Sequence, residues 1–323
     1  MKILVTGGAG YIGSVVTRML LSSGHDVRVA DALLHGGQGL LGLFHEERFQ
    51  FVCGDLRDTS AARRAIEGIE AVVHLAAIVG DPACARQPQL ARDVNVEASL
   101  RLFDLSRAAG IKRFVFASTC SNYGRMANPA VFLTEESALR PVSLYAETKV
   151  EVERALLQAP TSSDPASVVL RFATVFGLSP RMRFDLTVNE FTMELLAKRK
   201  VTIYGEQFWR PYIHVRDVGR AITLVLESPV SKVAGQAFNV GDSSQNFQKG
   251  ALAELIRSQI GNHAQIDWVE KAEDPRDYKV SFEKIQQELG FRITRTVVDG
   301  VRELIDAISC GIITDFDNPR YRN

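Results

Sequence analysis

Residues 1–13, MKILVTGGAGYIG, decide the fold of this chain. The apolar run at residues 3–5 is typical of a strand buried on both faces, and Gly7, Gly10 and Gly13 follow it. Glycines at these places let the backbone bend sharply, approach a pyrophosphate closely and pack the next helix on the strand. The first N–H groups of that helix would then face the phosphates. The stretch therefore predicts a strand, a phosphate-binding turn and a helix.

The residues after this turn indicate which cofactor it would bind. Apolar residues continue at helical spacing to Leu20, and a second short strand, 27–30, ends at Asp31. An acidic side chain about twenty residues beyond the glycines accepts hydrogen bonds from the adenosine ribose and repels a 2′-phosphate. We therefore predict NAD rather than NADP. A plain βαβ unit without a ligand is the alternative that the glycines alone leave open.

Composition excludes several classes of partner. The chain has 323 residues, 46% of them apolar, and 38 basic side chains balance 38 acidic ones, so no global field favours a nucleic acid or a membrane. The cysteines at 53, 84, 120 and 310 form no CxxC pair, and six scattered histidines offer no metal-ligand spacing. We expect no metal. Without a signal-like segment or an apolar run near about 18 residues, a cytoplasmic protein with reduced thiols is expected.

Strand and helix patterns alternate along the chain. Apolar runs at 49–53, 71–75, 113–117 and 168–172 predict strands, and helices are expected at 60–67, at 89–109 and from 143. This alternation predicts an α/β fold, a doubly wound parallel sheet (Rossmann) with a smaller C-terminal α/β substrate lobe. We expect an NAD-binding domain at 1–176, with 212–242 packing back onto it, and a substrate lobe at 177–323. That lobe would hold a helix at 189–197, a strand at 201–205 and helices near 248–260, 281–289 and 296–309.

Tyr145 and Lys149 are the strongest candidates for chemistry. Four residues apart on a predicted helix, they share one face. A lysine ammonium and a positively charged nicotinamide both favour phenolate, which would lower the tyrosine pKa from about 10 toward neutrality. Such a tyrosine can exchange a proton with a sugar hydroxyl. An isolated YxxxK is more often an exposed helix face, but Thr119 ends the preceding strand and could hold the same oxygen.

The motifs together resemble a known family. They are TGGAGYIG at 6–13, Asp31, Gly54-Asp55-Leu56, HLAA at 74–77, Asn95, Ser118-Thr119 with Tyr123-Gly124, and YAETK at 145–149. As a set, in this order and over essentially the whole chain, they resemble the extended short-chain dehydrogenase/reductases that act on nucleotide sugars. Within that family the chain is most similar to the UDP-glucose 4-epimerase-like enzymes.

The resemblance implies roles by position. Tyr145 would be the acid/base, Lys149 would bind the nicotinamide ribose and depress the tyrosine pKa, and Thr119 would bond the reacting hydroxyl. Asp55 and Leu56 would flank the adenine. The remaining implied cofactor contacts are Gly7, Gly10, Tyr11, Ile12, Gly13, Asp31, Leu75, Ala76, Ala77, Asn95, Ser118 and Phe172.

The resemblance also implies substrate contacts. Arg210, in QFWRPYIHVRD at 207–217, matches an arginine that grips the sugar-nucleotide diphosphate, and a guanidinium fork suits phosphate oxygens. Arg276 and Asn189 are further candidates, for which an ordinary surface role is the alternative. The other expected contacts are Thr119, Cys120, Ser121 and Thr174, the last standing where the family usually has asparagine.

Departures from the family pattern narrow the reaction. The 4,6-dehydratases carry an Asp-Glu pair after the active threonine and the decarboxylases a glutamate, but this chain has Cys120 and Ser121 there. Both eliminations are therefore disfavoured. The 3,5-epimerases place a cysteine at the position of Ser121, so Cys120 is interpreted as a small residue buried behind the active loop. The segment 78–84 should border the sugar.

We therefore predict an NAD-dependent epimerase of a nucleotide-diphosphate sugar that works through a transient 4-keto intermediate. A keto-sugar nucleotide reductase or oxidase, and a non-catalytic NAD sensor, are the alternatives. The long helices at 89–109 and 143–159 resemble those that form homodimer interfaces in this family. The sequence does not encode a recognisable preference for one sugar, one base or one pathway.

Overall fold

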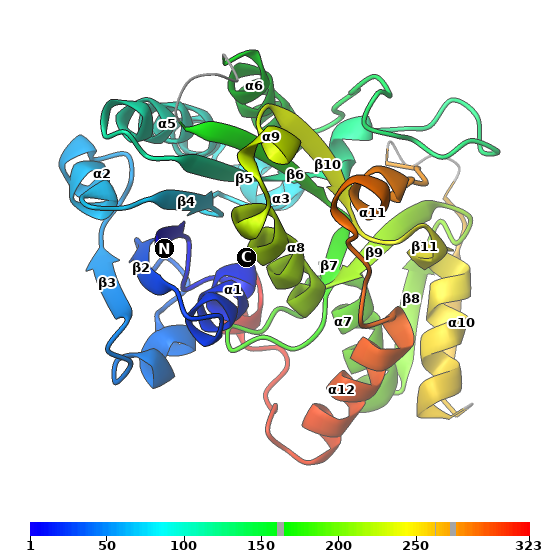
Figure 1. Cartoon of the computed structure of the whole chain (residues 1–323). Helices are drawn as coiled ribbons and strands as arrows, with labels where there is room; N and C mark the ends of the chain where they lie inside the picture. The colour runs from blue at the N-terminus through cyan, green and yellow to red at the C-terminus, as the bar shows by residue number, and fades with distance from the viewer. Residues whose placement is uncertain (160–164, 262, 272–275) are drawn as a thin grey trace.

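The computed structural model describes residues 1–159, 165–261, 263–271 and 276–323. Within them, seven parallel strands form the central sheet (Figure 1). The strands are β1 (Lys2–Thr6), β2 (Asp26–Asp31), β3 (Phe49–Cys53), β4 (Ala71–His74), β5 (Arg113–Thr119), β6 (Ala166–Phe172) and β10 (Gln236–Val240). Their order, β10-β6-β5-β4-β1-β2-β3, is that of a doubly wound sheet whose order reverses beside β1. The predicted fold class is confirmed.

Helices cover both faces of this sheet. α1 (Tyr11–Ser22) packs against α8 (Val215–Glu227) on one face, and α2 (Thr59–Ile66), α5 (Ala98–Ala108) and α6 (Leu144–Gln158) cover the other (Figure 1). Successive strand side chains point to opposite faces, so Ile3 and Val5 enter the first core and Leu4 enters the second. Two buried faces explain why β1 and β4 carry continuous apolar runs rather than alternating apolar and polar residues.

The connection between β4 and β5 differs from its prediction. The expected helix at 89–109 consists of α4 (Pro88–Arg92), a π-helical turn at Asp93–Glu97 and α5. The segment after β4, for which the sequence predicted no element, begins with α3 (Asp81–Arg86). The π-helical turn places Asn95 toward the interior, where it contacts the backbone at the end of β4.

The chain outside the large sheet forms two small sheets. β7 (Thr174–Phe176), β9 (Trp209–His214) and β11 (Asn246–Gln248) form one, and β8 (Lys200–Tyr204) pairs with β12 (Gln265–Val269) in the other. Around them lie α7 (Thr187–Met193), which continues as a π-helical turn at Glu194–Lys198, α10 (Lys249–Ile260) and α12 (Val297–Ser309). α9 (Val230–Val233) and α11 (Glu283–Leu289) contact β6 and β10 of the large sheet. The expected helices and the β8 strand are present, and β7, β9, β11 and β12 were not predicted.

The domain division and the homodimer remain predictions. The division of the chain at residues 176 and 177 remains our proposal, although β10 does pair with β6 as expected. The homodimer also remains a prediction; α5 and α6, on which it rests, lie on the same face of the sheet. In the part of the chain that the structure describes, no helix is long and apolar enough to cross a membrane.

Candidate active site

A cavity of about 460 Å³ lies at the carboxyl ends of the central strands and is also lined by Arg181, Arg210 and Arg276 from the later part of the chain. It contains both the glycine turn after β1 and the Tyr145 face of α6. All of the predicted site residues line it except Asn95, Cys120 and Asn189. The fold thus brings predicted site residues from Gly7 to Thr174 to the same cavity as Arg210 and Arg276.

The glycine turn leaves no room for side chains. Gly7 has φ +68°, and a Cβ there would lie 2.8 Å from the backbone of Ala76. A Cβ on Gly13 would overlap the carbonyl oxygen of Gly7. Because α1 begins at Tyr11 without a side-chain cap, its first N–H groups are available to a ligand in the cavity. This cradle fits the pyrophosphate of a dinucleotide.

Two carboxylates shape the far end of the cavity. Asp31, at the end of β2, accepts hydrogen bonds from the N–H groups of Ala9 at 2.9 Å and Leu33 at 2.8 Å, and so holds the glycine turn. Asp55 accepts from the backbone and guanidinium of Arg57 at 2.7 to 2.9 Å. The side-chain bond from Arg57 holds the pKa of Asp55 below its usual range. The Asp55 carboxylate therefore remains ionised beside the cavity.

The candidate catalytic groups come from the end of β5 and the first two turns of α6. Thr119 Oγ1 and Ser121 Oγ share a hydrogen bond at 2.6 Å. Lys149 is only 3% exposed, and its Nζ donates to the carbonyl of Ala117 at 3.0 Å. That Nζ lies 6.0 Å from the ring centroid of Tyr145. Burial lowers the pKa of Lys149 to about 8.

The expected lowering of the Tyr145 pKa is not what this structure shows. Burial raises the pKa of the phenol above its usual value, with smaller contributions in the same direction from Cys84 and Asp81. Arg183 opposes them. The physical reason is that desolvation outweighs any nearby charge, while the Lys149 ammonium is occupied by Ala117. A lowered pKa in the presence of the nicotinamide remains a prediction.

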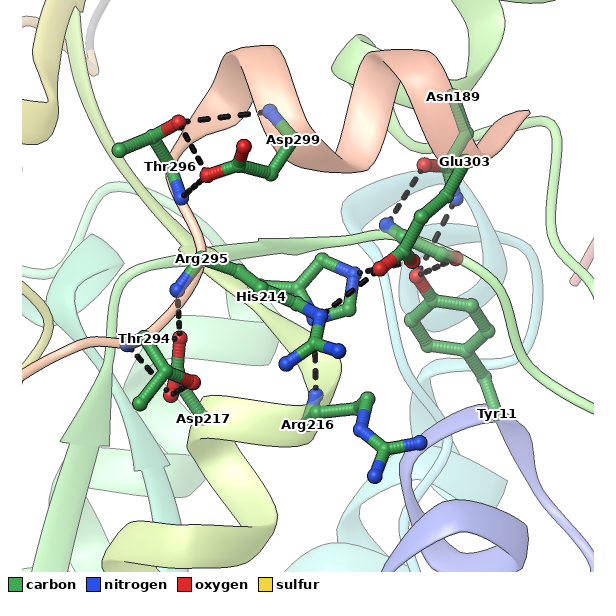
Figure 2. Close-up of polar contacts among 11 residues, drawn as sticks. Tyr11, Asn189, His214, Arg216, Asp217, Thr294, Arg295, Thr296, Asp299 and Glu303 are labelled. Carbon is green, nitrogen blue, oxygen red and sulfur yellow. Dashed lines mark hydrogen bonds and ion pairs between the residues drawn. The ribbon is translucent and has the colours of Figure 1, made fainter. Parts of the chain in front are cut away.

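Asn189 does not reach the cavity, which corrects its prediction as a substrate contact. Its Oδ1 accepts from the N–H of Gly177 at 2.9 Å, and its Nδ2 donates to Tyr11 Oη at 3.2 Å and to the carbonyl of Arg183 at 2.9 Å. Tyr11 in turn donates to the carbonyl of Gly177 at 2.7 Å. Figure 2 shows Asn189 and Tyr11 facing each other. The fully buried Asn189 amide therefore positions the chain after β7 through these hydrogen bonds, and it does not contact a ligand in the cavity.

Cys120 and Asn95 also lie outside the cavity wall. The Cys120 thiol is buried, donates to the carbonyl of Arg171 at 3.2 Å and has its pKa raised by burial, so the predicted substrate contact is wrong for this geometry. Its position behind the loop matches the interpretation of a small buried residue. Asn95 bonds the N–H of Ile78 at 2.8 Å and Thr148 Oγ1 at 3.2 Å. It positions the cavity wall after β4 instead of contacting a ligand directly.

Arg181, Arg183 and Tyr278 are among the cavity residues that were not predicted. Arg181 and Arg183 come from the connection after β7, and Arg183 forms a bidentate pair with Asp185 at 2.9 and 2.7 Å. Tyr278 lies beneath the guanidinium of Arg210, whose carbon is 5.2 Å from the ring centroid. The Arg-Met-Arg run after Gly177 was a visible signal for the first two, since closely spaced arginines after a strand suit an anion. Nothing local marked Tyr278.

The chain is similar in sequence and in fold to known proteins. A family model described as the NAD dependent epimerase/dehydratase family matches residues 3–241. The chain is 30% identical to a UDP-glucose 4-epimerase of Corynebacterium glutamicum over 309 residues, 90% of each chain. It is also 30% identical to a dTDP-glucose 4,6-dehydratase of Streptomyces griseus, covering 93% of this chain and 91% of that protein. Among solved structures, the Thermus thermophilus UDP-glucose 4-epimerase in complex with NAD has a TM-score of 0.83 at 27% identity, over 97% of this chain and 100% of that one.

Proposed function

The chain belongs to the NAD dependent epimerase/dehydratase family, and we propose that it is an NAD-dependent epimerase of nucleotide-diphosphate sugars. The observation that carries the proposal is the set of Thr119, Tyr145 and Lys149 around one cavity, without a carboxylate at residues 120 and 121. NAD, the cofactor of this family, supplies reversible acceptance of a hydride from a sugar carbon. The glycine turn and Asp31 would hold it.

Residues of the chain would supply the proton transfer and the binding of cofactor and substrate. Tyr145 takes the proton of the sugar 4-hydroxyl and returns it, with Thr119 and Ser121 orienting that oxygen. Lys149, whose Nζ lies 6.0 Å from the ring centroid of Tyr145, would bind the nicotinamide ribose. Arg210, buried to 7% exposure on β9, holds the diphosphate of the substrate. If the 4-keto sugar rotates within the site, hydrogen can return to either face of C4.

The relatives include dehydratases as well as epimerases, so the two reactions must be separated. Removal of water requires an acid and a base aimed at neighbouring carbons of the sugar. In this chain Cys120 points away from the cavity to the carbonyl of Arg171, and Ser121 is held by Thr119. Neither residue can serve as a carboxylic acid or carboxylate. This absence supports epimerisation over dehydration.

The test is a substrate panel followed by proton NMR. UDP-glucose, UDP-N-acetylglucosamine, UDP-glucuronic acid and dTDP-glucose are incubated with the purified protein. We expect the C4 epimer of at least one of them, with no net change in NADH absorbance. A 4-keto-6-deoxy product would replace the proposal with a dehydratase. Stoichiometric NADH formation or consumption would replace it with a reductase or oxidase.

A variant pair tests the role of Tyr145. Tyr145→Phe removes the proton-exchanging hydroxyl and should lower kcat by about 100-fold to 10,000-fold while NAD stays bound. Tyr204→Phe is the matched control, because Tyr204 is 57% exposed on β8 and does not line the cavity. It should keep full activity. Comparable turnover in both variants would refute the assignment of Tyr145.

We also propose that the protein is a homodimer through α5 and α6. Light scattering of the purified protein measures its mass in solution. A monomer at working concentration would contradict the proposal.

A further inference from the structure

Arg181 is a buried arginine in the cavity wall whose guanidinium is only partly bonded. The residue is 7% exposed and lines the cavity. Its Nη2 donates to the carbonyl of Arg322 at 3.0 Å, but its Nε is buried and has no hydrogen-bond partner among the described residues. Arg183, two residues later, has a carboxylate pair in Asp185. Because a buried charge is costly unless it is paired, the environment of Arg181 indicates an anion on the cavity side.

The backbone that carries Arg181 is attached to the start of α1. Ser179 Oγ donates to the carbonyl of Tyr11 at 2.7 Å and shares a hydrogen bond with Ser14 Oγ at 3.1 Å. A Cβ placed on Gly39 would lie 3.2 Å from the Cβ of Ser14 and 3.6 Å from the Cβ of Arg181. The Arg181 side chain therefore leaves the backbone beside the first turn of α1, directly next to the glycine turn.

The charges around the cavity show why this position matters. Within residues 1–121, all of which the structure describes, no lysine or arginine lines the cavity, whereas Asp31 and Asp55 do. The cationic side chains of the wall come from later residues: Lys149, Arg181, Arg183, Arg210, Lys249 and Arg276. A dinucleotide pyrophosphate at the glycine turn would otherwise meet only the partial positive charge of the α1 N-terminus.

We propose that Arg181 binds the pyrophosphate of NAD at the glycine turn. The guanidinium supplies a full positive charge that residues 1–121 do not bring to the cavity, and the phosphate oxygens supply the partner that its Nε lacks. The connection after β7 thereby becomes part of the cofactor site and links it to the second lobe. This inference depends on the cofactor of the family and not on the proposed epimerase reaction.

The test measures how fast bound NAD exchanges with isotope-labelled NAD in the purified protein. Arg181→Met should raise the off-rate of NAD about tenfold to 100-fold, the effect of losing a charge-assisted hydrogen bond. Arg18→Met is the matched control: Arg18 lies on α1 and donates to the carbonyl of Ser14 at 2.8 Å, but it does not line the cavity. It should leave the off-rate unchanged.

Further measurements separate a binding role from a structural one. Circular dichroism should show an unchanged fold, and the NAD-free melting temperature of Arg181→Met should not fall, because the substitution removes an incompletely paired buried charge. Arg181→Gln is the second variant, and it should raise the NAD off-rate in the same way. Unchanged NAD exchange in the folded variants would overturn the inference. Weakened binding of UDP with unchanged NAD exchange would also overturn it, by assigning Arg181 to the substrate diphosphate.

Discussion

Replacing Lys149 by methionine should stabilise the protein while abolishing its turnover. Burial lowers the pKa of Lys149 from its usual 10.5 to about 8, and one pKa unit corresponds to about 1.4 kcal/mol, so the charged form costs about 3 kcal/mol in the folded state. Losing the hydrogen bond to the Ala117 carbonyl offsets about 1 kcal/mol of this. We therefore expect Lys149→Met to raise the free energy of unfolding by about 2 kcal/mol at neutral pH.

The dependence on pH has a definite sign. At neutral pH Lys149 is protonated in both the folded and the unfolded chain, so its full cost is present. Between about pH 8 and about pH 10.5 the unfolded chain binds more protons than the folded one, so the unsubstituted protein gains stability relative to the variant. Above that range Lys149 is neutral in both states. The advantage of Lys149→Met is therefore largest near neutrality and fades as the pH rises.

Urea unfolding of NAD-free protein at several pH values measures this difference, since bound NAD would add its own stabilisation. Lys232→Met on α9 is the control, because that lysine is exposed and its replacement removes no buried charge. A variant less stable than the unsubstituted protein at neutral pH would refute the reasoning. A stability difference that stays constant through the alkaline range would refute it equally, because the cost would not come from the charge.

Three other substitutions test the site. Glu153→Gln should lower the free energy of unfolding by about 3 to 5 kcal/mol in urea titrations, because it leaves Arg171 charged in an ion pair whose side chains are 5% and 1% exposed; a change near zero would contradict this. Gly13→Ala should yield protein from which no NAD is released on acid denaturation, because its Cβ would overlap the Gly7 carbonyl oxygen. A normal NAD content would show that the glycine turn does not hold the pyrophosphate. Asp31→Ala should reduce the ratio of NAD to NADP affinity in competition binding, and an unchanged ratio would exclude Asp31 as the discriminating residue.

Much of the large sheet could be predicted because its signals are local. Apolar runs such as residues 3–5 and 71–75 are buried on both faces, and helices of ten or more residues carry a clear 3.6-residue period. β7 and β11 were missed because three residues are too few to show a period, and β9 and β12 because polar residues interrupt their apolar runs. α3 was also too short to show a period, since six residues make less than two turns.

The candidate site was predictable only where a motif is continuous in the chain. Asp31 follows the glycines at a set spacing and Tyr145 lies one helical turn from Lys149, so their proximity follows from backbone geometry. Asn189 and Cys120 show the limit: each had a suitable side chain, but their hydrogen bonds to Gly177 and to Arg171 turn them away from the cavity. Residue type alone does not give the direction of a side chain.

The amino-acid sequence by itself determined most strands of the large sheet, the glycine turn and the expectation of NAD, because each depends on a local run of residues. Only the folded chain showed that Arg181 returns to the first turn of α1, more than 160 residues earlier, through Ser179 and Tyr11. It also showed that burial raises the pKa of Tyr145 and lowers that of Lys149. Charge, solvent exclusion and long-range contact are properties of the packed structure, so no local pattern of residues could have given them.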